Sequence, residues 1–272
     1  MEAEEFARLD RIWNFQQFKE ELPMCVVVPG YNNNAKFRIE YNLNSIFQQN
    51  YTNYFVVVIN DASTDNSDEL YRKYFDFYQI SKDSYAYVEN KERKTALENI
   101  YIATHDYCSP DSIVLNLDAD DEFIGKNVLK TFNAGYQKNK AGVVYSNFFW
   151  YDQGGNIMLG FTSEYTETDK KNKTYRQAPQ RFSHLRSYRT ELFLKIKKED
   201  FQDKDGNFWT SAYDMVMYFP LMELSCGRVN KIEGFHYLYN INTGLNDYSV
   251  DNTKQSRIDQ VLRRGDRYDC SV

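Results

Sequence analysis

Four short apolar runs, separated by helical patterns, constrain this chain more than any other feature. The runs are MCVVV, FVVVI, YAYV and IVLNL, at residues 24–28, 55–59, 85–88 and 113–117. They have the length of strands, and the first, second and fourth show little alternation, as strands covered on both faces do. Strands that alternate with helices about every 30 residues form right-handed βαβ units, so the sequence predicts a parallel sheet.

Helical patterns fill the intervals between these runs and follow the last one. They place apolar side chains on one face, and one pattern has an acid-rich first turn after the capping residues Ser63 and Thr64. The predicted helices cover residues 35–49, 65–80, 93–107 and 125–139.

The pattern changes after residue 122. Residues 141–152 predict one or two strands with a turn at QGGN, and residues 162–181 predict a loop. Residues 212–227 predict a helix that is interrupted or kinked near Pro220. Residues 246–272 are polar and weakly patterned. Because no repeat or linker is visible, we expect a single domain over residues 1–272, with functional halves that meet at residue 122.

Composition limits the partners and the compartment. The 272 residues carry a net charge of −6, which argues against nucleic acid and anionic membranes as main partners. No run approaches 18 apolar residues, and the acidic start MEAEEFARLD does not resemble a signal peptide. The cysteines are scattered, so we expect reduced thiols and a cytoplasmic location. They are Cys25, Cys108, Cys226 and Cys270.

Polar segments follow all four predicted strands. They read PGYNNN, NDASTDNS, ENKERK and DADDEF. Any one of them could be an ordinary turn, but ligands of open parallel sheets bind beyond the carboxyl ends of the strands. Four such ends together therefore predict a site.

Several familiar sites are absent from the sequence. There is no G-x-G-x-x-G after the first strand, no G-x-x-x-x-G-K-[ST] and no G-x-S-x-G. An EF-hand that started at Asp118 would have Phe123 where Gly is needed and Leu129 where Glu is needed. Dinucleotide, P-loop, hydrolase and EF-hand interpretations are thereby weakened.

The ordered set of these segments resembles the family 2 glycosyltransferases of GT-A fold. The resemblance is strong over residues 24–124 and looser over 182–242, and DADD matches the family's Asp-x-Asp signature. NDASTD resembles the family's Asp-Asp-Gly-Ser-Thr-Asp turn, with Asn60 for the first Asp and Ala62 for Gly. The resemblance implies an α/β GT-A fold whose central sheet is mostly parallel and flanked by helices.

The resemblance also implies a nucleotide-sugar donor and a divalent cation, Mn²⁺ or Mg²⁺. Such hard metals take carboxylate oxygens and substrate phosphates. Asp120 would be the main metal ligand, Asp118 would hold the ribose or share the metal, and Asp121 would orient the donor sugar or the metal's water. The alternative for these acids is a solvated turn that caps the next helix.

Further donor-binding residues follow from the same resemblance. Three of them would shape the base pocket, Asp61 would accept a hydrogen bond from the base, and two would contact base or phosphate. The first three are Pro29, Tyr31 and Asn33, and the last two are Asn90 and Lys94. A plain helix N-terminus is the alternative for Asn90 and Lys94.

The family's general base is an acid at the start of a helix in the second half. TSAYDMVMYF offers Asp214, with Tyr213 in place of the Glu of the family's Glu-Asp pair. A base must be an unpaired carboxylate near the acceptor hydroxyl, and burial would raise its pKa usefully. The alternative is an acid stabilised by the helix dipole. Glu223 is a rival base, but it lies about 2.5 turns further on and would face away.

One basic segment stands out in this acidic chain. Between Lys170 and Lys198 lie ten Lys or Arg residues and one acid, Glu191. Within it, His184 and Arg186 are candidates to hold phosphate or the acceptor, with a solvated basic face as the alternative. His236 is a candidate third metal ligand, with a core histidine as the alternative.

These roles predict an inverting transfer of one hexose-type sugar, from a UDP-sugar by preference, to a hydroxyl of a glycan or similar acceptor. The Gln-x-x-Arg-Trp motif of processive members is absent. A sugar-phosphate nucleotidyltransferase is the rival enzyme, although PGYNNN is not the Gly-rich, Arg-containing loop that it needs. A non-catalytic nucleotide- or sugar-binding module is the other alternative.

Overall fold

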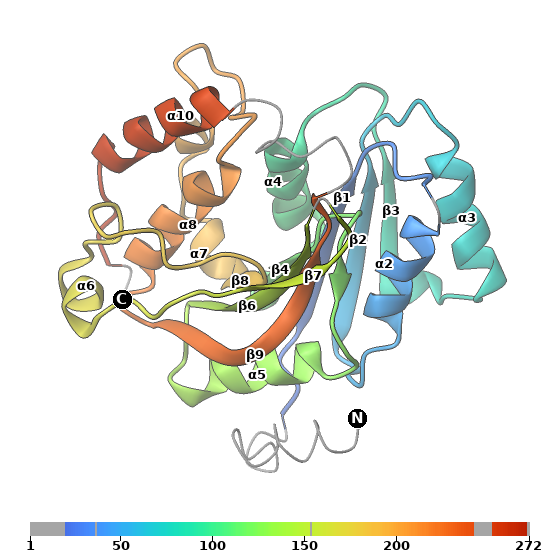
Figure 1. Ribbon diagram of the computed structural model, residues 1–272, viewed down its shortest axis with the longest axis horizontal. Helices are drawn as coiled ribbons and strands as arrows, with labels where there is room; N and C mark the ends of the chain where they lie inside the picture. The colour runs from blue at the N-terminus through green and yellow to red at the C-terminus, as the bar shows by residue number, and fades with distance from the viewer. Residues whose placement is uncertain (1–19, 36, 153, 242–251, 271–272) are drawn as a thin grey trace.

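The computed structural model describes residues 20–35, 37–152, 154–241 and 252–270. One sheet runs through both predicted halves, in the strand order β3-β2-β1-β4-β8-β6-β9-β5, with β7 paired to β6 (Figure 1). The single sheet means that residues far apart in the sequence meet near its centre.

The first half forms the predicted parallel βαβ units. β1 pairs in parallel with β2 and β4, and β2 pairs in parallel with β3. The strands are β1 (Met24–Gly30), β2 (Tyr54–Asn60), β3 (Tyr85–Glu89) and β4 (Ile113–Asn116). The intervening helices are α2 (Arg38–Phe47), α3 (Ser67–Phe77) and α4 (Ala96–Asp106), with the short η2 (Lys82–Ser84) before β3. The strands and helices predicted for this half are confirmed.

The second half joins the sheet mainly through antiparallel pairs. β8 is antiparallel to both β4 and β6, β5 is antiparallel to β9, and β7 forms a hairpin with β6, whereas β6 and β9 are parallel. These strands are β5 (Glu122–Phe123), β6 (Val143–Tyr151), β7 (Ile157–Gly160), β8 (Arg186–Arg189) and β9 (Val229–Tyr239). The predicted α/β class is confirmed, while parallel pairing dominates only the first half.

Helices cover both faces of the sheet. Val26 and Val28 pack with α2, α3 and α5 (Val128–Lys138), whereas Cys25 and Val27 pack with α4, α7 (Thr190–Phe193) and α8 (Tyr213–Leu224) (Figure 1). Successive side chains of a strand point to opposite faces, so both sets must be apolar. This explains why the strand sequences show so little alternation.

Three predictions for the second half need correction. The expected loop 162–181 contains α6 (Glu167–Asn172), which begins with a capping box of Thr166 and Asp169. α8 runs through Pro220, so of the interrupted and kinked alternatives the interruption is wrong, and the weakly patterned end forms α10 (Asn252–Arg264). α6 has no buried residue, and α10 has only three apolar residues in an otherwise polar sequence, one of them the buried Ile258, so both patterns are weak. A short η3 (Lys198–Phe201) precedes α8.

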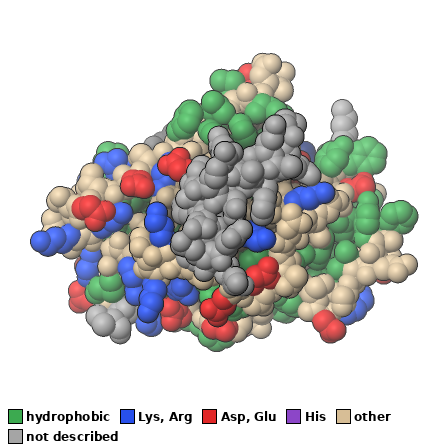
Figure 2. Space-filling model, turned by 90° about the horizontal axis from the view of Figure 1, so that it is seen from below, with side chains coloured by type: hydrophobic (Ala, Val, Ile, Leu, Met, Phe, Trp, Pro, Cys, Tyr) green, Lys and Arg blue, Asp and Glu red, His purple; other side chains and the backbone are tan. Residues whose placement is uncertain are grey.

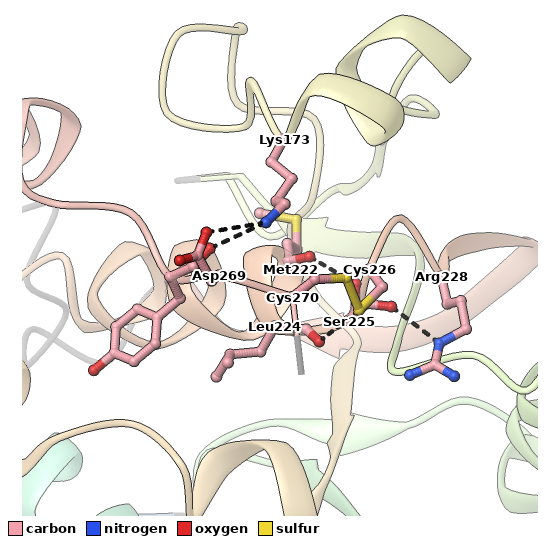
Figure 3. Close-up of a disulfide and its surroundings, with 9 residues drawn as sticks. Lys173, Met222, Leu224, Ser225, Cys226, Arg228, Asp269 and Cys270 are labelled. Atoms are coloured by element: carbon pink, nitrogen blue, oxygen red, sulfur yellow. Dashed lines mark hydrogen bonds and ion pairs between the residues drawn. A yellow bond between two sulfur atoms is a disulfide. The ribbon is translucent and has the colours of Figure 1, made fainter. Parts of the chain in front are cut away.

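The prediction of four reduced thiols is wrong. Cys25 in β1 is bonded to Cys108, which follows α4, and Cys226 after α8 is bonded to Cys270 (Figure 3). The partners are 83 and 44 residues apart, so spacing in the sequence does not reveal them. Disulfides persist mainly in oxidising compartments, so the expected cytoplasmic location loses this support. In the described part of the chain, no helix has the length and apolarity needed to cross a membrane.

Candidate active site

The DADD turn lies where β1 and β4 end and is fixed by the main chain. Ala119 N–H donates to the Pro29 carbonyl at 3.2 Å, which continues the pairing of β4 with β1. The Asn42 side-chain amide in α2 donates to the carbonyls of Asp118 and Asp121 at 3.0 and 2.7 Å. The acids are therefore held in a turn of defined shape.

Asp118 faces residues from the second half of the chain. The Tyr213 hydroxyl at the start of α8 lies 3.2 Å from both Asp118 carboxylate oxygens. Burial raises the pKa of the Asp118 carboxyl and Asp214 adds to the rise, while Arg186 and the Tyr213 hydroxyl act against it. Asp118, Asp214 and Arg186 are thus brought together, as a shared site requires.

Asp121 lies in the interior. It is 1% exposed, and its carboxylate accepts hydrogen bonds from the Tyr237 hydroxyl at 2.5 Å and from Asn240 N–H at 2.7 Å. Burial, with further contributions from Asp120 and Asp118, raises the pKa of the Asp121 carboxyl well above its usual value. This placement does not fit the expected contact with donor sugar or metal water, so we assign Asp121 a structural role.

Asp118 and Asp120 have the chemistry to hold a divalent metal. Both side chains are partly exposed. Within the described ranges, no three His, Cys, Asp or Glu side chains stand close enough to hold a metal by themselves. Mg²⁺ commonly binds one or two carboxylates together with substrate phosphates, so two hard oxygen donors fit a cation that arrives with a diphosphate.

His236 is not brought to these acids. Its Nε2 lies 3.0 Å from the Glu233 carbonyl, and its ring packs edge-on against Phe132 of α5. The side chain is 4% exposed, and burial lowers the pKa of His236 to about 4. These contacts are those of a core histidine, so its predicted metal role is not supported.

Asp214 is ion-paired, contrary to the expectation of an unpaired base. Arg186 Nη1 lies 3.4 Å from Asp214 Oδ2, and Gln180 Nε2 donates to the same oxygen at 3.2 Å. Burial alone would lower the pKa of the Arg186 guanidinium, but Asp214 and its other neighbours raise it overall. Arg186 therefore stays charged beside both Asp214 and Asp118.

The rival base Glu223 belongs to the interior. It is fully buried, and Arg176 binds both of its carboxylate oxygens at 2.7 and 3.0 Å. Tyr268 N–H donates to the same carboxylate at 3.1 Å. Glu223 is therefore neither unpaired nor accessible from the surface, which does not fit the requirements for a base.

The predicted base-recognition residues meet at the start of α4. Asp61 is 3% exposed and accepts hydrogen bonds from the Asn90 side chain and from the N–H groups of Lys94 and Thr95, at 2.8, 2.8 and 3.1 Å. The Lys94 ammonium instead pairs with Glu98 at 2.9 Å. Asp61 thus anchors the loop, and its oxygens already carry protein donors.

The remaining donor-pocket residues lie on the neighbouring loop. Pro29 is buried at the end of β1, and Asn33 is 4% exposed with its N–H bonded to Ser67 Oγ at 2.8 Å. The Tyr31 ring stacks with the guanidinium of Arg93, whose Cζ lies 3.7 Å from the ring centroid. Ala62 has φ of +55°, a conformation that Gly adopts at no cost, which explains why the family uses Gly there.

His184 completes an aromatic stack behind the acids. Its ring stacks on Tyr237 and Tyr239, with centroids 4.7 and 4.5 Å apart. Burial, with Arg186 next, lowers the pKa of His184 well below its usual value, so the imidazole is neutral at pH 7. A neutral ring suits hydrogen bonding or stacking better than binding of phosphate.

The basic segment is not one solvated face. Arg176 and Arg186 are 6% and 5% exposed. Arg176 pairs with the fully buried Glu223 and Arg186 with the partly exposed Asp214, whereas most lysines of the segment are exposed. In Figure 2, Lys and Arg side chains gather toward the side of the molecule where α6 lies, among scattered acids. Only part of the segment can therefore serve an anionic ligand from the surface.

Sequence reasoning missed the phenols that contact the acids. The sequence singled out Tyr213 only as a replacement for the Glu of the family's pair. It singled out His236, although the residue that bonds to Asp121 is the neighbouring Tyr237. Gln180 and Arg93 were also missed. Alternation along β9 offered the one available signal, because adjacent residues of a strand face opposite sides.

Comparison with known families agrees with this geometry. Residues 25–197, more than half of the chain, match the sequence profile described as Glycosyl transferase family 2. The chain belongs to this family. A curated relative, "Glycosyltransferase GlyG" of Streptococcus pneumoniae serotype 4 (strain ATCC BAA-334 / TIGR4), is 28% identical over 142 residues, which cover 52% of this chain and 44% of the relative.

Solved structures share the fold of this family 2 chain. S. aureus TarS matches with a TM-score of 0.60 at 20% identity, over 81% of this chain and 37% of TarS. TarS 1-349 in complex with UDP-GlcNAc matches with a TM-score of 0.62 at 19% identity, over 89% of this chain and 66% of that structure. Mannosyltransferase PcManGT from Pyrobaculum calidifontis, in complex with GDP-Man and Mn²⁺, matches with a TM-score of 0.58 at 17% identity, over 97% of this chain and 74% of PcManGT. The match thus covers less than half of GlyG and of the first of these TarS structures.

Proposed function

We propose that this protein transfers one sugar from a nucleotide-diphosphate sugar, a UDP-sugar by preference, to a hydroxyl acceptor with inversion of configuration. The observation that carries the proposal is the meeting of Asp118 from the nucleotide half with Asp214 and Arg186 from the acceptor half. Family membership supports it, as do the UDP-GlcNAc and GDP-Man complexes of TarS and PcManGT.

Each side chain has a role that follows from its place. Asp61 and Tyr31 would border the nucleobase, and Asp118 would hold the ribose or share a metal with Asp120. A bound Mn²⁺ or Mg²⁺ would neutralise the charge that develops on the departing diphosphate. Arg186, whose Nε has no hydrogen-bond partner among the described residues, would reach toward the same phosphates.

Asp214 would act as the general base toward the acceptor hydroxyl. It must then exchange Arg186 for the acceptor, since a paired carboxylate is a poor base. The 3.4 Å separation from Arg186 Nη1 is long for a charge-assisted bond, so this exchange requires little rearrangement. Positioning and electrostatics would supply most of the rate.

The test is a screen of UDP- and GDP-sugars with Mn²⁺ and Mg²⁺, in which released nucleotide and glycosylated product are both measured. Asp120→Ala should lower turnover roughly 1,000-fold, because metal stabilisation of the leaving group amounts to several kcal/mol. Asp214→Asn should lower kcat about 100- to 10,000-fold and leave donor affinity unchanged. The exposed Asp76→Asn is the matched control.

The outcomes separate the alternatives. Nucleotide binding without product from any acceptor would indicate a binding module. Pyrophosphate release from a nucleoside triphosphate and a sugar phosphate would indicate a nucleotidyltransferase. Product whose anomeric configuration is retained would contradict the inverting mechanism.

A further inference from the structure

Tyr213 contacts the donor-binding acid although it belongs to the acceptor-side helix. It is the first residue of α8, directly before Asp214, and lies 95 residues beyond Asp118 in the sequence. Its hydroxyl is 3.2 Å from each carboxylate oxygen of Asp118. The phenol therefore links the two halves of the site through its contact with Asp118.

This contact has the geometry of a weak, shared hydrogen bond. A hydroxyl has one proton, so it can donate to only one of the two oxygens at a time. O–H···O⁻ bonds are ordinarily about 2.5–2.7 Å long, well below the two equal distances found here. The Tyr213 hydroxyl is thus a partner that a better ligand can displace.

Arg186 and the start of α8 border Tyr213 beside the acids. The Arg186 guanidinium carbon lies 5.7 Å from the centre of the Tyr213 ring, and Arg186 also pairs with Asp214. Residue Ala212, which precedes α8, has φ of +52°, so the first turn begins at a sharp change of backbone direction. A shift of the phenol is therefore coupled to the first turn of α8.

The donor and Tyr213 compete for the same atoms. Under the proposed function, on which this step rests, the Asp118 carboxylate binds a ribose hydroxyl or a metal ion. Both oxygens that such a ligand would use are in contact with the Tyr213 hydroxyl. Because the hydroxyl lies equally far from both oxygens, it stands where a ligand that uses both oxygens would bind, and such a ligand would displace it.

We propose that Tyr213 is a positioning residue that occupies Asp118 until the donor binds, and that its displacement moves the first turn of α8 so that Asp214 can meet the acceptor. No covalent bond changes in this step, because one hydrogen-bond donor or cation replaces another. Donor must consequently bind before the acceptor is activated. The ligand that would displace the Tyr213 hydroxyl is a nucleoside diphosphate with its divalent cation.

The test is titration of UDP, and separately GDP, with MnCl₂ at pH 8 by calorimetry, on the wild-type protein and on Tyr213→Phe. Tyr213→Phe should bind the nucleotide roughly 2- to 10-fold more tightly, because one net hydrogen bond no longer has to be broken. Its kcat for sugar transfer should nevertheless fall roughly 10-fold, with a larger share of sugar lost to water. A residue that only supports the fold would not produce tighter binding.

The matched control is Tyr218→Phe, which removes from the same helix a buried hydroxyl that has no hydrogen-bond partner within the described part of the chain. Its nucleotide affinity should equal that of the wild-type protein. Unchanged or weaker binding by a folded Tyr213→Phe would overturn the proposal for Tyr213 alone. Failure of the wild-type protein to bind either nucleotide would overturn the proposed function as well.

A second measurement does not depend on the folding of that variant. Fluorotyrosine placed at position 213 should give a ¹⁹F resonance that shifts when UDP and the diamagnetic MgCl₂ are added together and does not shift with MgCl₂ or NaCl alone. A resonance that ignores the nucleotide, in protein shown to bind it, would refute the displacement.

Discussion

The buried pair of Glu223 and Arg176 gives the sharpest test of which acids are structural and which are catalytic. Glu223→Ala removes the carboxylate that accepts two bonds from Arg176 and one from Tyr268 N–H. Among the described residues, the guanidinium of Arg176, which is 6% exposed, would keep one hydrogen bond, to the Leu262 carbonyl at 2.6 Å. Breaking a buried ion pair from one side costs about 3–5 kcal/mol.

This cost is large against the total stability of a folded domain, which is about 5–15 kcal/mol. With a urea m-value of about 3 kcal/mol per M, a loss of about 4 kcal/mol lowers the unfolding midpoint by about 1.3 M. The assay is urea unfolding followed by circular dichroism, with sugar transfer measured on the protein that remains folded. Transfer by folded Glu223→Ala should match the wild-type rate.

Two controls make the result specific. The double variant Glu223→Met with Arg176→Met should recover most of the stability, because apolar replacement of both partners is often neutral. The exposed pair of Lys73 and Glu69 should give a change below about 1 kcal/mol for Glu69→Ala. Wild-type stability combined with lost transfer in Glu223→Ala would refute the reasoning and restore Glu223 as the base.

Three further predictions concern the core histidine and the nucleobase end of the site. His236→Gln should keep its response to Mn²⁺. It should also reduce the pH dependence of the free energy of unfolding. In the wild-type protein His236 is neutral in both states above pH 6.5, whereas between pH 6.5 and about 4 only the unfolded state binds the proton, so stability falls by about 1.4 kcal/mol per pH unit. Urea unfolding at several pH values should show that this slope is missing from the variant. Thr95→Gly should stabilise the protein by about 1 kcal/mol in thermal melts and preserve nucleotide affinity, because Thr95 has φ of +93° and ψ of 159°, a region used almost only by Gly; a lower melting temperature would contradict this. Asp61→Ala should lower the free energy of unfolding by about 1–3 kcal/mol and weaken nucleotide binding, because it leaves the N–H groups of Lys94 and Thr95 unpaired. A nucleotide affinity equal to that of the wild-type protein, measured by calorimetry, would contradict its role.

The parallel half of the fold was predictable because its signals are local. Strands β1, β2 and β4 are buried on both faces, and their sequences are apolar without alternation for that reason. The acids at the end of β4 were predictable too, since the carboxyl edge of a parallel sheet is where ligands bind. Both inferences use residues close together in the sequence.

The second half was predictable only in part because its interactions are distant. β8 is four residues long and takes its place between β4 and β6 through pairing that no local pattern encodes. The contacts of Tyr213 and Tyr237 with acids 95 and 116 residues earlier, and both disulfides, arise from the same topology. Asp214 was predicted as a candidate base from its place at the start of a helix, but its pairing with Arg186 was not predicted.

The hydrogen bonds around the buried pair of Glu223 and Arg176 have a consequence for the order in which the chain can fold during synthesis. Arg176 emerges from the ribosome before Glu223, but the Leu262 carbonyl and the Tyr268 N–H that complete their bonding emerge last. A nascent chain that has reached only α8 would therefore carry this charge pair near the C-terminal end of α8 without the hydrogen bonds to residues 262 and 268. Assembly of the acceptor side must wait for residue 268, long after the parallel strands have left the exit tunnel.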